Sequence, residues 1–196
     1  MILRKTMIRR ETMTARPEDA PRTLPRLLLW NAECLPNRDA IREKKYGIWQ
    51  TFSWRAYAEE VCRFAQGLAN LGFRRGDRLA VVGDNRPRLY FAMLAAQSLG
   101  GIALGVYQDA IAAEMGFVLN HAEARIIVAE DEEQVDKLFE VRERIASVSR
   151  VIYLDPRGLE LRDDPWLIRY EDVLARGDRF ASAHPGDTIL FSPAFA

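Results

Sequence analysis

Apolar residues recur at helical spacing in the first third of the chain. Leu24 and Leu28 begin one pattern, with Pro25 in its first turn, where proline is tolerated. A longer pattern follows Ser53, a residue type that caps helices. Its apolar face forms one continuous stripe of Tyr57, Val61, Phe64, Leu68 and Leu71. Gly72 follows at the position where glycine commonly ends a helix, so two helices are predicted here.

Two short strand-like runs separate these helices. Apolar side chains alternate or cluster in residues 40–42 and 48–52. Residues 44–47 between them contain a glycine. This arrangement is typical of a β-hairpin.

Short apolar runs and amphipathic segments alternate through the rest of the chain. The runs are apolar on both faces, as in the buried strands of a parallel sheet. The predicted strands are 79–82, 102–106, 125–129, 151–154 and 188–191, and the predicted helices are 85–99, 109–119, 130–142 and 170–175. This order predicts an α/β fold: a doubly wound, mainly parallel sheet with flanking helices and an N-terminal β-hairpin.

Two of the predicted helices carry signals at their first turns. Asp109 is expected to cap the first of them. Its inner face is predicted to hold Ile111, Met115, Val118 and Leu119. The acidic residues 130–133 suit the positive end of the next helix, whose pattern continues to Arg142.

The ends of the predicted strands are the candidate functional region, because open α/β sheets bind ligands beyond the carboxyl ends of their strands. These ends are residues 83–86, 107–110 and 130–132 and the residues after Phe191. No G-x-G-x-x-G, G-x-x-x-x-G-K-[ST] or G-x-S-x-G motif is present. The sequence thus predicts a nucleotide-type scaffold without a complete phosphate loop.

Composition excludes several classes of function. Lys and Arg together number 28, as do Asp and Glu, which removes the excess of positive charge that nucleic-acid binding requires. Cys34 and Cys62 form no C-x-x-C motif, and His121 and His184 are the only histidines, so no metal site is expected. No run of about 18 apolar residues exists, and a cytoplasmic protein with reduced thiols is expected.

Residues 1–21 are basic and poor in apolar side chains, and they are expected to be disordered. Peripheral contact of this arm with anionic lipid stays open. Asp84 follows a predicted strand, as the phosphoacceptor of a receiver domain does, but the acidic pair of such domains is missing. A turn is the simpler interpretation of Asp84.

Three motifs in order carry a resemblance to a known family. They are Thr51-Phe52-Ser53-Trp54, then Gly72-Phe73-Arg74-Arg75-Gly76-Asp77-Arg78-Leu79-Ala80, then the segment from Asn85 to Gly101. In this order they resemble the N-terminal subdomain of the AMP-forming acyl- and aryl-CoA synthetases, most of all bacterial long-chain fatty acid–CoA ligases. The resemblance covers residues 22–191, and residues 192–196 match no family motif.

The resemblance implies a reaction and its participants. In this family a carboxylate attacks the α-phosphorus of Mg-ATP, and the thiol of CoA then displaces AMP. Fatty acid, ATP, Mg²⁺ and CoA are the participants implied. The loop of Tyr107, Gln108 and Asp109 corresponds to the region where the pantetheine arm of CoA approaches, although a turn with Asp109 as a helix cap is the simpler interpretation. No catalytic residue or metal ligand is assigned.

The sequence departs from the family near its end. Residues 187–191 should lead into a loop of the type Y-T-S-G-T-T-G-x-P-K around the ATP phosphates, and residues 192–196 do not match it. A truncated member that is inactive alone is therefore expected. Apolar surface left exposed favours a homo-oligomer. The alternative is a non-catalytic α/β module that binds a ligand or complements a separate chain.

Overall fold

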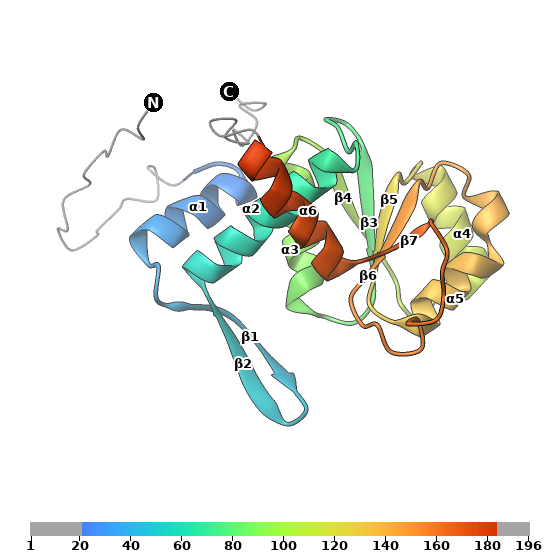
Figure 1. Cartoon of the computed structure of the whole chain (residues 1–196), viewed down its shortest axis with the longest axis horizontal. Coiled ribbons are helices and arrows are strands. Elements are labelled where there is room, and N and C mark those ends of the chain that lie inside the picture. The colour runs from blue at the N-terminus through green and yellow to red at the C-terminus, as the bar shows by residue number, and fades with distance from the viewer. Residues whose placement is uncertain (1–20, 184–196) are drawn as a thin grey trace.

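The computed structural model describes residues 21–183 and has two parts (Figure 1). The first part consists of helix α1 (Leu24–Cys34), strands β1 (Asp39–Lys45) and β2 (Ile48–Ser53), and helix α2 (Trp54–Asn70). The second part consists of β3 (Arg78–Val82), α3 (Pro87–Ser98), β4 (Ile102–Val106), α4 (Ala112–His121), β5 (Ile126–Ala129), α5 (Glu132–Glu140), a 3₁₀ turn (Arg142–Arg144), β6 (Arg150–Tyr153), β7 (Leu167–Arg169) and α6 (Tyr170–Ala183).

The main sheet is parallel throughout, with strand order β4-β3-β5-β6-β7. Helices α2, α3 and α6 cover one face, and α4 and α5 cover the other (Figure 1). Side chains alternate between the two cores, so Val81 packs toward the first group of helices and Val82 toward the second. The predicted doubly wound α/β fold is confirmed.

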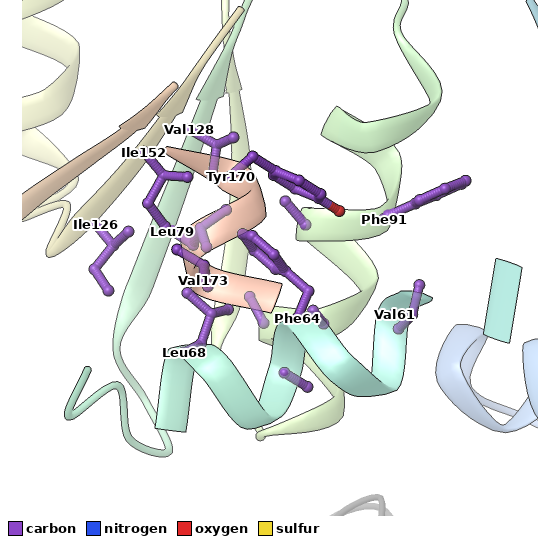
Figure 2. Packing of buried hydrophobic residues seen from close by; sticks show 14 of the residues in the cluster. Val61, Phe64, Leu68, Leu79, Phe91, Ile126, Val128, Ile152, Tyr170 and Val173 are labelled. Carbon is purple, nitrogen blue, oxygen red and sulfur yellow. The ribbon is translucent and has the colours of Figure 1, made fainter. Parts of the chain in front are cut away.

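The core beside α2 and α6 is built on two stacked aromatic rings. Phe64 and Tyr170 lie with centroids 4.5 Å apart, and both are fully buried. Figure 2 shows them next to Leu79 and Val128 of the sheet. The stripe predicted for α2 is the face that meets this core, and Ser53 caps the helix by accepting a hydrogen bond from the Ala56 amide.

Several element boundaries differ from expectation. Strand β7 was not predicted, and α6 continues to Ala183, well beyond the predicted end at residue 175. Helix α5 ends at Glu140, and Arg142 belongs to the 3₁₀ turn that follows. The predicted strand 188–191 lies outside the described residues, as do residues 1–20, 192–196 and His184.

Two predictions about α4 are wrong. Its N-cap is Ile111, which makes no side-chain capping bond, so Asp109 does not cap the helix. Ile111 is 62% exposed and Val118 40% exposed, whereas Met115 and Leu119 are buried as expected. The reason is a rotation of the helix that turns Gly116 inward, where it fits against Val141.

Helices α2 and α6 approach so closely that only glycine fits at two crossing positions. A Cβ on Gly67 would overlap the carbonyl oxygen of Val173, and a Cβ on Gly177 would overlap the carbonyl oxygen of Arg63. Beside this contact, Arg63 donates two hydrogen bonds of 2.7 Å to the carboxylate of Asp178. Close backbone contact and a bidentate ion pair therefore hold α6 against α2.

Acid is expected to destabilise the protein through such pairs. Hydrogen bonds from Arg63, Arg142 and Arg157 lower the pKa of Asp178, Asp164 and Asp155 respectively. A carboxyl whose folded pKa is depressed contributes stability above its unfolded pKa, about 3.9, and loses it as the pH falls through the folded value. We expect the free energy of unfolding to fall below about pH 4.

Urea titrations across this range measure the effect. Asp178→Asn should make the acid decline shallower, and the exposed Asp163→Asn should leave it unchanged. Asp131 acts in the opposite sense, because burial raises its pKa and protonation then favours the folded state. A decline of equal steepness in Asp178→Asn and the unmodified protein would contradict the assignment to the Arg63 pair.

Candidate functional site

The carboxyl ends of the parallel strands meet at one edge of the sheet, the lower edge in Figure 1. Residues 83–86, 107–110 and 130–132, which follow β3, β4 and β5, lie there as predicted. The structure adds residues 155–158, which follow β6 and were not anticipated as part of the site. We call these four segments the carboxyl-edge loops.

Glu130 joins two of the carboxyl-edge loops. Its carboxylate is only 14% exposed; it accepts a hydrogen bond from the backbone N–H of Asp84 and another, 2.6 Å long, from Nε of Arg86. Gly83 makes this possible, because a Cβ there would lie 2.5 Å from Cβ of Glu130. Asp84 therefore lies in a turn that Glu130 holds in place, as the simpler interpretation of its sequence position proposed.

Lys137 anchors the loop of Tyr107, Gln108 and Asp109. Its Nζ donates a hydrogen bond of 2.7 Å to the carbonyl of Gln108 and forms an ion pair of 2.8 Å with Glu133. Tyr107 is 72% exposed, and its hydrogen bond with Asp109 raises the pKa of the tyrosine hydroxyl. Lys137 thus fixes the backbone of the loop, and the ring of Tyr107 is exposed to solvent. Sequence reasoning missed Lys137.

The charge of the edge is predominantly acidic. Asp131 caps α5 by accepting a hydrogen bond from the Gln134 amide; burial raises its pKa, and Glu130 adds to the shift. Gln134 is itself buried, and its Oε1 atom has no hydrogen-bond partner within residues 21–183. The cations of the edge are Arg86 and Arg157, and each is paired with a carboxylate.

This chemistry does not suit a triphosphate. Phosphate oxygens require free cations or clustered N–H donors, and the paired arginines of this edge are engaged already. Within residues 21–183, no group of three His, Cys, Asp or Glu side chains could hold a metal ion. The carboxyl-edge loops thus offer phosphate oxygens no arginine that is free of a carboxylate partner.

Replacing Lys137 with methionine is expected to loosen the Tyr107 loop. Methionine keeps much of the volume but removes one hydrogen bond and one ion pair, which should lower the free energy of unfolding by about 1 kcal/mol. Amide hydrogen exchange at residues 107–110 should accelerate about fivefold. Lys44→Met, at an exposed position, is the matched control. Unchanged exchange in Lys137→Met would show that Lys137 does not hold the loop.

Comparison with known proteins identifies the family. Residues 28–189 match the sequence model of a family described as AMP-binding enzyme, which is most of the chain. The chain belongs to the AMP-binding enzyme family. The resemblance to AMP-forming synthetases, based on three ordered motifs, is thereby confirmed.

Two related sequences and one solved structure show how much of this family the chain represents. The uncharacterized protein Rv1549 of Mycobacterium tuberculosis is 35% identical over 100 residues, which are 51% of this chain and 57% of that protein. Long-chain-fatty-acid–CoA ligase ACSBG2 of Xenopus laevis is 28% identical over 138 residues, 70% of this chain and 18% of the ligase. A putative long-chain-fatty-acid CoA ligase of Rhodopseudomonas palustris has the same fold, with a TM-score of 0.65 at 24% identity, over 77% of this chain and 36% of that structure.

The chain therefore spans about half the length of one relative and less than a fifth of the other. Within residues 21–183, no helix has both the length and the apolar character needed to cross a bilayer.

Proposed function

We propose that this chain supplies part of an AMP-forming long-chain fatty acid–CoA ligase. The observation that carries the proposal is the family match over residues 28–189, together with the parallel sheet whose loops gather at one edge. The reaction has two steps, transfer of an adenylyl group to the acid and transfer of the acyl group to CoA. A fatty-acid carboxylate attacks the α-phosphorus of ATP and pyrophosphate leaves; the CoA thiol then attacks the acyl carbon and AMP leaves.

The role we assign to residues 107–109 is contact with the pantetheine arm of CoA. Tyr107 offers an exposed apolar ring, and Lys137 fixes the carbonyl of Gln108 beneath it. Asp109 restrains the tyrosine hydroxyl through their hydrogen bond. The carboxyl-edge loops thereby form a wall for a neutral, partly apolar ligand.

The groups that bind ATP phosphates and Mg²⁺ are not provided by the described edge. Its arginines are paired with carboxylates, and residues 21–183 contain no group of three or more His, Cys, Asp or Glu side chains placed to hold a metal ion. We therefore assign these contacts to residues beyond the described part, and we derive no step of the reaction through the metal. A polypeptide of residues 1–196 alone should form no thioester.

Complementation tests the proposal. The chain is co-expressed with a second polypeptide, the R. palustris ligase from which the structurally matched region has been removed. Pyrophosphate release that depends on both fatty acid and CoA is expected from the pair and from neither polypeptide alone. Tyr107→Ala should raise the KM for CoA in the active pair, with Phe117→Ala, at an equally exposed ring, as control. An inactive pair that nevertheless associates would contradict the proposal.

A stand-alone binding module is the second candidate, and one observation favours it. The M. tuberculosis relative is itself a short protein, since 100 aligned residues make up 57% of it. A short member that acts alone would bind an acyl or nucleotide group without turning it over. This function would be favoured if the single chain bound palmitoyl-CoA or AMP saturably while the two co-expressed polypeptides released no pyrophosphate.

We also propose that the protein is cytoplasmic and that it forms a homo-oligomer. Large apolar side chains are exposed on β4, on the segment that follows it and on α4, among them Ile102, Tyr107, Ile111 and Phe117. Exposed apolar surface of this kind marks contact regions. Sedimentation velocity should therefore show concentration-dependent association, and Phe117→Asp should weaken it.

A further inference from the structure

The β1–β2 hairpin stands apart from the main sheet and projects from the body of the molecule (Figure 1). Its two faces differ. On the inner face Ile41 and Phe52 pair across the strands and are half-buried against the core, where Phe52 meets the ring of Phe91 edge-on at 5.3 Å. The inner face thus fixes the hairpin to the body.

The outer face and the tip of the hairpin are exposed to solvent and combine aromatic rings with cations. Lys44 lies directly across from Trp49, and the Arg42 guanidinium lies 6.0 Å from the centre of the Trp49 ring. At the tip, the Lys45 ammonium lies 5.8 Å from the centre of the Tyr46 ring. Exposed fractions are 77% for Tyr46, 65% for Ile48 and 63% for Trp49.

Arg42 and Lys44 share the outer face with Trp49, whereas Lys45 and Ile48 lie on the face of Glu43, nearer the tip. The acidic Glu43 points to the inner side, where it pairs with Gln50 and is half-buried. Near the tip, Arg157 of the carboxyl-edge loops interacts electrostatically with Tyr46, and Asp155, its ion-pair partner, does so with Lys45, so this pair adds no net charge to the hairpin. The exposed hairpin is therefore a locally basic, aromatic surface on a chain whose net charge is zero.

We propose that this hairpin docks the protein on an anionic lipid surface. Trp and Tyr rings favour the boundary between headgroups and acyl chains, and flanking Lys and Arg favour anionic headgroups. The combination of Tyr46, Ile48 and Trp49 with Arg42, Lys44 and Lys45 matches both requirements. The inference goes beyond the proposed ligase function and does not depend on it.

Other partners fit this surface less well. A stable dimer needs about 800 Å² from each chain, and three exposed side chains of this size offer only on the order of 500 Å². Nucleic acid requires a broad positive field, which a chain with 28 acidic and 28 basic residues lacks. A lipid surface requires neither a large buried area nor a broad positive field, because a few inserted rings and a few charges suffice for reversible contact.

Vesicle sedimentation with the full chain tests the proposal. Vesicles of phosphatidylglycerol and phosphatidylcholine in equal parts are compared with vesicles of phosphatidylcholine alone. Binding is expected only to the anionic vesicles, and high salt should weaken it. Lys44→Glu with Lys45→Glu should reduce the partition coefficient at least tenfold, since each cation contributes about fivefold. Arg144→Glu, at an exposed position away from the hairpin, is the matched charge control and should have a smaller effect.

Trp49 itself provides a second readout. Its fluorescence should be quenched by phospholipids with brominated acyl chains, and Trp49→Phe should abolish that part of the quenching while binding is retained. Trp49→Ala with Tyr46→Ala should lose binding, whereas Leu24→Ala, at an exposed apolar position in α1, should bind normally. Thermal unfolding of each variant shows whether the fold is intact.

Three results would overturn the proposal. The first is no binding of the unmodified chain to anionic vesicles. The second is binding that survives the hairpin variants but is lost when residues 1–20 are deleted, which would assign lipid contact to the basic arm. The third is lipid-independent self-association that the hairpin variants abolish, which would identify a second copy as the partner. Ligase complementation is measured separately, so neither proposal can fail through the other.

Discussion

Replacing Gly177 with alanine is expected to destabilise the protein by on the order of 3 kcal/mol. The added methyl group would overlap the backbone carbonyl oxygen of Arg63, so α6 would have to move away from α2. Helix propensity alone would change stability in the opposite direction, because alanine is favoured over glycine by about 1 kcal/mol. A net loss therefore means that the steric cost exceeds that gain. Urea unfolding measures the difference.

Gly116→Ala in α4 is the matched control for this substitution. A Cβ there would lie 3.1 Å from a side-chain carbon of Val141, which can shift, whereas the backbone of Arg63 cannot do so cheaply. Helix propensity and crowding should nearly cancel, and the free energy of unfolding should stay within about 1 kcal/mol of the unmodified protein. Equal effects of the two substitutions would show that α2 and α6 do not meet backbone to backbone.

Replacing Gly83 with alanine is expected to cost about 2–3 kcal/mol and to disorganise the carboxyl edge. Gly83 has a φ of +149°, which other residues rarely adopt, and its Cβ would lie 2.5 Å from Cβ of Glu130. Glu130 would have to withdraw from the Asp84 amide and from Arg86. Faster amide exchange at residue 84, together with the loss of stability, is the expected signature.

Gly105→Ala in β4 separates this effect from the general consequences of removing a glycine. Nothing lies within 4 Å of a Cβ at Gly105, and its φ is not in the left-handed region. A small gain of about 0.5 kcal/mol is expected there. If Gly83→Ala were as well tolerated as Gly105→Ala, the close approach of Glu130 would not exist.

The parts of the fold that the sequence predicts are those governed by local pattern. Strands β3 and β5 are continuous apolar runs because both of their faces are covered by helices. The apolar stripe of α2 and its Ser53 cap are equally local signals, as is the hairpin turn at Gly47. Each depends on neighbours within a few residues. The hairpin is found, but its turn is shorter than the predicted 44–47, because Lys44 and Lys45 pair with Trp49 and Ile48 in the strand ladder.

The parts that the sequence does not predict depend on contacts between distant residues. Strand β7 has only three residues, too short for a pattern, and it forms because β6 offers a free edge. Gly177 interrupts the apolar pattern of α6 and suggests an early helix end, but its role is the close approach to Arg63. A glycine within an otherwise helical pattern can mark such a crossing, and here two face each other.

The candidate site likewise combines features that the sequence predicts with features that depend on contacts between distant residues. Its position at the strand ends follows from the parallel topology and is predictable. The contact between Lys137 and Gln108 joins residues 29 apart, and that between Glu130 and Arg86 joins residues 44 apart. No local signal marks these partners. Asp109 was interpreted as a cap because of its residue type, whereas in the structure it is bonded to Tyr107.

The most direct test of the account is the reaction of the purified chain of residues 1–196 with palmitate, ATP, Mg²⁺ and CoA. The account holds that these residues carry the scaffold of an AMP-binding enzyme, with edge cations already committed to carboxylates. It predicts that neither palmitoyl-AMP nor palmitoyl-CoA appears above the background without protein. Formation of either product at a rate proportional to chain concentration would contradict it.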